Sequence, residues 1–291
     1  MKSSSELFPV TLLSAERKEG WDEDTYILKP NNSHDSTVEF ALTRFSRRGV
    51  KCHASVLWLP HFLTSRLEWL DGWSTALLHM LGRGYDLWFM EWRGHGASGF
   101  NANWARNELQ DLAYADFPAA CDFIIEQSGE APWIVAERSA AQVWVAAHET
   151  PDDQRGPNQR IKGGVLLWPM VGTVSVAQYA HTMGWEDRQL TVSRQQVRRH
   201  DHHESINRSL FDQLLLGQPQ RLRKWKARRQ PAPFCVVEHK TYEKLVHKWL
   251  DSHPVAAGTV RLTAPDEVDA SLLTRWLEEV SARTSQAANA T

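Results

Sequence analysis

A serine that follows an apolar run is the most informative chemical feature of the sequence. An apolar, strand-like run that begins at Trp133 leads to Ser139, and small residues then begin a helix-like run over 140–147. A sharp strand-to-helix turn of this kind holds a serine hydroxyl above a sheet, ready to attack a carbonyl. The usual pattern is Gly-x-Ser-x-Gly, whereas this chain has Glu-Arg-Ser-Ala-Ala over 137–141. A helix N-cap without chemistry is the alternative role for Ser139.

The elements that must position this serine alternate between strands and helices. Apolar runs predict strands over 37–45, 55–59, 86–90, 133–135, 165–168, 234–237 and 260–262. Amphipathic runs bounded by glycine, proline or polar residues predict helices over 67–81, 107–127, 139–149, 242–250 and 268–280. This order indicates a mostly parallel sheet of about eight strands with helices on both faces. We expect a polar lead-in over 1–36, one domain over 37–283 with a helical cap inserted at 172–229, and a flexible tail over 284–291.

A second motif follows the strand predicted over 86–90. It reads Glu-Trp-Arg-Gly-His-Gly-Ala-Ser-Gly over 91–99, and Leu-Pro-His-Phe over 59–62 and Gly-Arg-Gly-Tyr over 82–85 accompany it. With Asp116 upstream of the serine, these residues resemble the α/β-hydrolase superfamily. The resemblance is to its lysophospholipase and monoacylglycerol-lipase-like (serine aminopeptidase-like) branch, and it covers roughly residues 38–280.

The resemblance implies a serine ester hydrolase that acts through an acyl-enzyme on a small acyl or lipid-like substrate, without a cofactor. Ser139 would be the nucleophile, and the backbone N–H groups of Ala140 and of His61 or Phe62 would form the oxyanion hole. Trp92 and Trp168, which follow strand ends, would line an apolar substrate pocket or else pack as rim residues.

The acid and the base depart from the pattern that the resemblance implies. The expected order is serine, then an acid after a late strand, then a histidine after the last strand. No histidine follows the strand predicted over 260–262, where Asp266 and Glu267 stand instead. One hypothesis exchanges the two roles, with His239 as base and Glu238, Asp266 or Glu267 as acid. Asp266 is also suited to capping the last helix. Because the expected histidine is missing, the triad is degenerate. The alternative function is therefore a catalytically impaired protein that binds a ligand or a partner.

Two polar clusters in the expected cap suggest other chemistry. The run His-Asp-His-His-Glu over 200–204 resembles a metal site, but a solvated charged stretch is the preferred interpretation, and we predict no metal. The basic run over 221–229 is read as a solvated helix face, with attraction of an anionic substrate or acidic partner as the alternative.

Charge, hydropathy and cysteine spacing bear on the partners and the location of the protein. The net charge of −2 gives no reason to expect nucleic acid, and no apolar run is long enough to span a membrane. The three cysteines lie far apart and do not show paired spacing, which favours a reducing, cytoplasmic location. The oligomeric state is not predicted.

Overall fold

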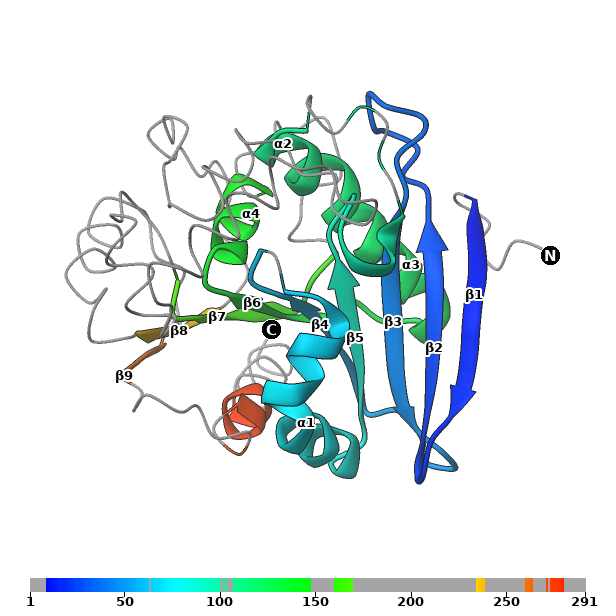
Figure 1. Cartoon of the computed structure of the whole chain (residues 1–291). Helices are drawn as coiled ribbons and strands as arrows, with labels where there is room; N and C mark the ends of the chain where they lie inside the picture. Colours follow the sequence, from blue (N-terminus) through cyan, green and yellow to red (C-terminus); the bar gives the residue numbers. More distant parts are fainter. Residues whose placement is uncertain are drawn as a thin grey trace, which may run out of the picture.

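The computed structural model describes residues 9–62, 64–99, 101, 103, 107–147, 160–169, 234–238, 260–263, 271 and 273–279. In this part of the chain, nine strands form one sheet with helices on both faces (Figure 1). The strands are β1 Val10–Arg17, β2 Trp21–Leu28, β3 Phe40–Arg47, β4 Ala54–Leu59, β5 Tyr85–Glu91, β6 Trp133–Glu137, β7 Gly163–Leu167, β8 Phe234–Glu238 and β9 Val260–Thr263. The helices with assigned bounds are α1 Arg66–Gly82, α2 Leu109–Asp111, α3 Phe117–Ser128 and α4 Ala140–Ala147, and residues 271 and 273–279 are helical as well.

The sheet has the order β1-β2-β3-β5-β4-β6-β7-β8-β9. β1, β2, β3 and β5 pair antiparallel, and all pairs from β5 through β4 to β9 are parallel. The predicted mostly parallel sheet is therefore confirmed. Because the carboxyl ends of parallel strands meet at one edge, the residues after β4, β5, β6 and β7 gather above the middle of the sheet.

The interpretation of residues 1–36 as a lead-in outside the domain was wrong for residues 10–28. These residues form β1 and β2, which extend the sheet at its antiparallel edge. Only Val10 of β1 is buried, since this strand lies at the edge, and its sequence therefore does not carry the alternation that marks a half-buried strand. The expected cap over 172–229 and the tail over 284–291 lie outside the described residues.

Two apolar cores hold the layers together, one on each face of the sheet. One core joins the sheet to α2, α3 and α4, and the other joins it to α1 and the helical residues 273–277. The helix predicted over 107–127 is divided in the structure, where a π-helical turn over Leu112–Asp116 separates α2 from α3.

The helix after β6 lies close to the neighbouring strand β7. A Cβ atom on Gly164 would lie 3.0 Å from the Trp144 ring and 3.3 Å from the Ile134 carbonyl, so the glycine lets α4 pack closely on the sheet. All eight residues of α4 are buried, which fixes the start of the helix relative to the end of β6.

Candidate functional site

The turn between β6 and α4 is strained, and the strained residue is Arg138. Its φ is 49°, in the left-handed region that side-chain-bearing residues seldom adopt. The Arg138 N–H donates to the Leu167 carbonyl at 2.8 Å, and the Arg138 carbonyl accepts from the Ala141 N–H at 3.2 Å. These two bonds secure the turn to β7 on one side and to α4 on the other.

The position of the turn corrects the expected motif by one residue. A nucleophile elbow places its reacting side chain on the strained residue itself. With Arg138 at this position, the motif is Ala136-Glu137-Arg138-Ser139-Ala140, in which alanines stand at both glycine positions. Ala136, and not Glu137, therefore occupies the first glycine position.

Ser139 follows the strained residue and is fully buried. Its Oγ accepts a hydrogen bond from the Phe62 N–H at 3.0 Å and lies 2.9 Å from Nδ1 of His61. His61 and Phe62 are thus brought to the serine. However, the Phe62 N–H donates to the Ser139 side chain, so Ser139 Oγ occupies the place where such a donor would hold a substrate oxygen.

His61 and Glu137 form the buried polar surroundings of the turn. Burial, followed by Arg138 and His95, holds the pKa of His61 well below its ordinary value of 6.5, so its imidazole is neutral at neutral pH. Burial raises the pKa of Glu137, against the opposing effects of Arg138, the Trp58 indole N–H and the His61 backbone N–H. Trp58 Nε1 lies 3.4 Å from the Glu137 carboxylate.

The Arg138 guanidinium stacks on Trp168, the residue that follows β7. The guanidinium carbon lies 5.3 Å from the centre of the Trp168 ring, and the Arg138 side chain is 19 % exposed. Trp168 also has a positive φ, of 48°, and its N–H donates to the Val237 carbonyl at 2.8 Å. Two residues with positive φ after neighbouring strands are therefore in contact, a concentration of strain typical of functional sites.

An aromatic cluster continues from Trp168 beneath the turn. The Trp168 ring centre is 6.2 Å from that of Trp73, and Trp73 is 4.7 Å from Trp58, which is 5.2 Å from Trp69. Trp168 therefore lies at the turn and connects Arg138 to the core.

The other predicted site residues are dispersed or lie outside the described part of the chain. Trp92 is buried and its indole N–H donates to the Pro60 carbonyl at 3.1 Å, so it packs against the loop after β4. Ala140 is the first residue of α4, and Glu238 is the last residue of β8. His239, Asp266, Glu267 and the polar runs at 200–204 and 221–229 lie outside the described residues.

The motif after β5 builds a loop through contacts of its own residues. A Cβ atom on Gly96, whose φ is 55°, would come within 2.0 Å of the Glu91 carboxylate, so the glycine makes room for this acid. The Ser98 hydroxyl donates to the Glu91 carbonyl at 2.7 Å and accepts from the Ala41 N–H at 2.8 Å. These contacts join the loop to β3.

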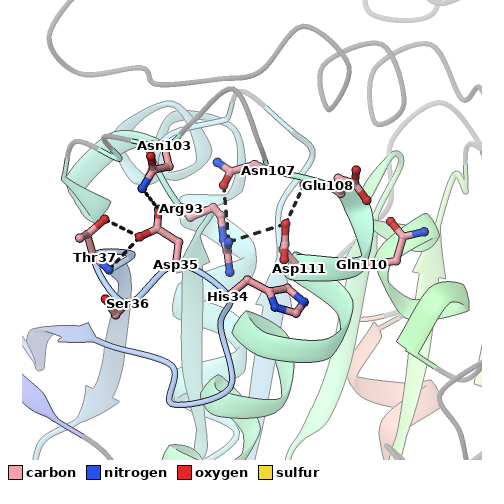
Figure 2. Close-up of a pocket in the computed structure, with 10 residues that line it drawn as sticks. All are labelled: His34, Asp35, Ser36, Thr37, Arg93, Asn103, Asn107, Glu108, Gln110 and Asp111. Carbon is pink, nitrogen blue, oxygen red and sulfur yellow. Dashed lines mark hydrogen bonds and ion pairs between the residues drawn. The ribbon is translucent and has the colours of Figure 1, made fainter.

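Arg93, in the same loop, is buried against the π-helical turn that precedes α3. Its Nε donates to Asp116 at 2.7 Å and its Nη2 donates at 2.5 Å, which makes a two-pronged buried ion pair. Arg93 also lies at the wall of a polar cavity of about 570 Å³ over β3 and β5 (Figure 2). This cavity is lined by His34, Asp35, Ser36, Thr37, Arg93, Asn103, Asn107, Glu108, Gln110 and Asp111.

The cavity side chains hold one another in place. Asp35 accepts from the Thr37 N–H at 2.9 Å and from the Asn103 amide at 2.9 Å, and Asp111 accepts from the Glu108 N–H at 2.9 Å (Figure 2). Asp35, Glu108 and Asp111 make the cavity rich in acids, and the sequence analysis did not identify it.

Within the described residues, no group of three His, Cys, Asp or Glu side chains is placed to hold a metal ion. No helix in the described part of the chain is both long and apolar enough to cross a membrane.

Comparisons with known proteins relate the chain to others by structure and not by sequence. No protein-family model and no curated protein matches the sequence. A monoglyceride lipase from Saccharomyces cerevisiae superposes with a TM-score of 0.56 and 11% identity, over 96% of this chain and 99% of the lipase. An acetyl xylan esterase from Paenibacillus sp. R4 gives a TM-score of 0.56 at 10% identity, over 95% of this chain and 89% of the esterase.

An epoxide hydrolase from Vigna radiata gives a TM-score of 0.52 at 11% identity, over 95% of this chain and 100% of the hydrolase. At these identities the likeness concerns the fold, which carries several activities among these three proteins. The sheet order, the strained turn after β6 and these superpositions agree: the chain has the α/β-hydrolase fold.

Proposed function

We propose that this chain is a binding protein built on the α/β-hydrolase fold, in which the place of the nucleophile is taken by Arg138. The observation that carries the proposal is the φ of 49° at Arg138, because the elbow presents its reacting group from the strained residue. A guanidinium stays protonated in proteins and does not attack a carbonyl, so an acyl-enzyme does not form at this position.

The surroundings of Ser139 support the same function. Its Oγ is fully buried and accepts the Phe62 N–H, which would otherwise stabilise a developing oxyanion. Since a single N–H that holds the serine is not directed at a substrate oxygen, the arrangement favours ligand binding over acyl transfer.

A second candidate is the serine ester hydrolase expected from the sequence, and one contact favours it. His61 Nδ1 lies 2.9 Å from Ser139 Oγ, which is within reach for proton transfer. A neutral His61 would take the hydroxyl proton as Ser139 attacks an ester carbonyl and would pass it to the alcohol that leaves. Water would then attack the acyl-enzyme and release the acid and the free Ser139 hydroxyl. In this candidate His61 replaces His239 as the base, and the substrate would be an acyl or lipid-like ester.

Turnover of p-nitrophenyl acetate and p-nitrophenyl octanoate separates the two candidates. We expect the wild-type chain, Ser139→Ala and His61→Asn to release p-nitrophenol at the same rate as one another, close to the rate without protein. Saturable turnover in the wild type that disappears in both variants would establish the hydrolase and contradict the binding protein.

The cysteines support a reducing location for this protein. Cys52, Cys121 and Cys235 are all free thiols, and burial raises the pKa of Cys235 to about 12. Thiols that do not form disulfides persist in the reducing cytoplasm, which is the location we propose.

A further inference from the structure

The polar cavity at Arg93 is formed by three segments that are separated in the sequence. Residues 34–37 lie between β2 and β3, Arg93 and Asn103 follow β5, and residues 107–111 lead into α2 and form it (Figure 2). The Asn103 amide donates to the Asp35 carboxylate at 2.9 Å and so joins two of these segments. The cavity wall is therefore held together by a specific contact.

The lining of this cavity indicates a ligand that forms many hydrogen bonds. Every described residue in the wall has a side chain that donates or accepts hydrogen bonds, so the cavity does not suit a hydrocarbon. Hydroxyl groups both donate and accept, which matches a wall that contains carboxylates, amides, hydroxyls and a guanidinium. The volume of about 570 Å³ lies within the range of about 300–1,000 Å³ that is usual for small-molecule sites.

The charge of the wall favours a cationic group on the ligand. Asp35, Glu108 and Asp111 contribute carboxylates, whereas Arg93 is the one Lys or Arg side chain among the described lining residues. Arg93 also forms its two-pronged ion pair with Asp116, which is fully buried. An anion that entered the cavity would therefore meet an excess of negative charge, and a cation would be attracted.

Asp35 is the carboxylate best placed to meet that cation. Its carboxylate accepts from the Thr37 N–H at 2.9 Å and from the Thr37 hydroxyl at 2.6 Å, besides the Asn103 amide (Figure 2). Burial opposes ionisation of Asp35, but these hydrogen bonds and the charge of Arg93 outweigh it, so the pKa of Asp35 lies below its ordinary value. An ionised carboxylate has about four acceptor positions, so Asp35 can also accept from a ligand.

The acids of the wall suit an extended organic cation better than a metal ion. Within the described residues, no three acids or histidines are grouped so that they could hold a metal. The Asp111 carboxylate accepts from the Glu108 N–H at 2.9 Å and lies 4.0 Å from Nη1 of Arg93, which partly neutralises it. The cationic end of a ligand therefore belongs at Asp35, with its hydrogen-bonding body toward Asp111.

We propose that this cavity binds a small polyhydroxylated amine, with its ammonium group at Asp35 and its hydroxyl groups along the rest of the wall. The ammonium group donates charge-assisted hydrogen bonds to the carboxylate, and the hydroxyl groups exchange neutral ones with the wall. This inference goes beyond the proposed function, because none of the described lining residues belongs to the turn at 136–140.

The test is calorimetric titration of the full chain at pH 7.5 with D-glucamine, sorbitol, gluconate and hexylamine. The first three share a hydroxylated chain and differ at one end, which is an ammonium, a hydroxyl or a carboxylate. Hexylamine keeps the ammonium and lacks the hydroxyls. We expect glucamine to bind about 10-fold more tightly than sorbitol, as one charge-assisted hydrogen bond implies. Gluconate and hexylamine should both bind more weakly than glucamine.

Asp35→Asn tests the place of the ammonium group, because it keeps the size of the side chain and removes its charge. It should lower the affinity for glucamine about 10-fold and leave the affinity for sorbitol nearly unchanged. Asp22→Asn is the matched control, since Asp22 is a surface aspartate on β2 that pairs with Arg48. It should bind all four compounds as the wild type does, and circular dichroism should show that both variants are folded.

Four results would overturn the inference. They are no binding of any of the four compounds, equal affinity for glucamine and sorbitol, equal affinity for glucamine and hexylamine, and full glucamine binding by Asp35→Asn. An equal loss of glucamine and sorbitol binding in Asp35→Asn would also contradict the ammonium site, because it indicates a merely structural role. The titrations on the wild type decide the ligand class even if Asp35→Asn does not fold. None of these results bears on ester turnover, so the proposed function is tested separately.

Discussion

The guanidinium of Arg138 lies against the indole of Trp168, and each of these residues has a positive φ, of 49° and 48°. They follow β6 and β7, two parallel strands that lie side by side in the sheet. A cation stacked on a ring contributes roughly 0.5–2 kcal/mol, which offsets part of the roughly 1–3 kcal/mol that such a backbone conformation costs. The contact between Arg138 and Trp168 therefore offsets part of the conformational strain at this turn.

The strain at Arg138 predicts an unusual order of stability for two truncations. Arg138→Gly and Arg138→Ala both remove the stacking on Trp168, but only alanine keeps a Cβ atom at a positive φ. We expect Arg138→Gly to be the more stable by about 1 kcal/mol, as measured by urea unfolding. The opposite order would show that the backbone at this position is not strained.

The contact between Gly164 and Trp144 predicts a packing defect on substitution. A Cβ on Gly164 meets the Trp144 ring at 3.0 Å and the Ile134 carbonyl at 3.3 Å, so Gly164→Val should lower the free energy of unfolding by about 1–3 kcal/mol. Gly72→Ala is the control, because nothing lies within 4 Å of its added Cβ on the exposed side of α1. It should raise stability by roughly 0.5–1 kcal/mol, and equal effects of the two changes would contradict this packing.

The ion pair between Arg93 and Asp116 predicts a large loss of stability. Both side chains are buried, at 1% and 0% exposure, so Arg93→Met leaves the Asp116 carboxylate in an apolar interior without its partner. We expect a loss of about 3–5 kcal/mol in urea unfolding. Arg48→Met, which breaks an exposed pair, should change stability by less than about 0.5 kcal/mol. A small effect of Arg93→Met would mean that Asp116 is not enclosed as described.

The buried His61 predicts how stability depends on pH. Its pKa is well below the 6.5 of an exposed histidine. Just below pH 6.5, His61 is therefore protonated in the unfolded chain and still neutral in the folded chain. Stability from this residue is present above pH 6.5 and is lost as pH falls below that value. Burial raises the pKa of Glu137, so this carboxyl group stabilises the folded state as pH falls, opposite to His61. This contribution of Glu137 is the same in the wild type and in a variant at position 61.

We therefore expect His61→Asn to unfold with a weaker dependence on pH than the wild type between pH 7.5 and 5. Urea midpoints at several pH values measure the difference. Parallel curves would show that the His61 imidazole is as easily protonated in the folded state as in the unfolded one.

Much of the fold was predictable because the central strands β4, β5, β6 and β7 are buried on both faces. β4 and β5, whose residues are all buried, were recognised as apolar runs with errors of one residue at their ends. β1 was missed because its edge position leaves most side chains exposed. The division of the long helix at 112–116 was also missed, since a π-helical turn changes the hydrogen bonds and not the apolar pattern.

The strained residue of the turn lies one position before the serine that the sequence analysis selected, and the physical reason for the difference is backbone conformation. A sequence shows which residue has a hydroxyl, and it does not show which residue has a positive φ. The small residues Ala136 and Ala140 were the available signal, because they flank Arg138 with the spacing of the usual glycines. The contact of His61 with Ser139 joins residues 78 positions apart, a distance in sequence that local patterns do not resolve.

The central claim is that Arg138, and not a nucleophilic serine, occupies the reacting position of the fold. Intact-mass spectrometry after incubation with a fluorophosphonate, which forms a covalent adduct with activated serines, tests this claim most directly. The claim predicts that the wild-type mass stays unchanged from neutral to alkaline pH. An adduct located on Ser139, and absent from Ser139→Ala, would contradict it.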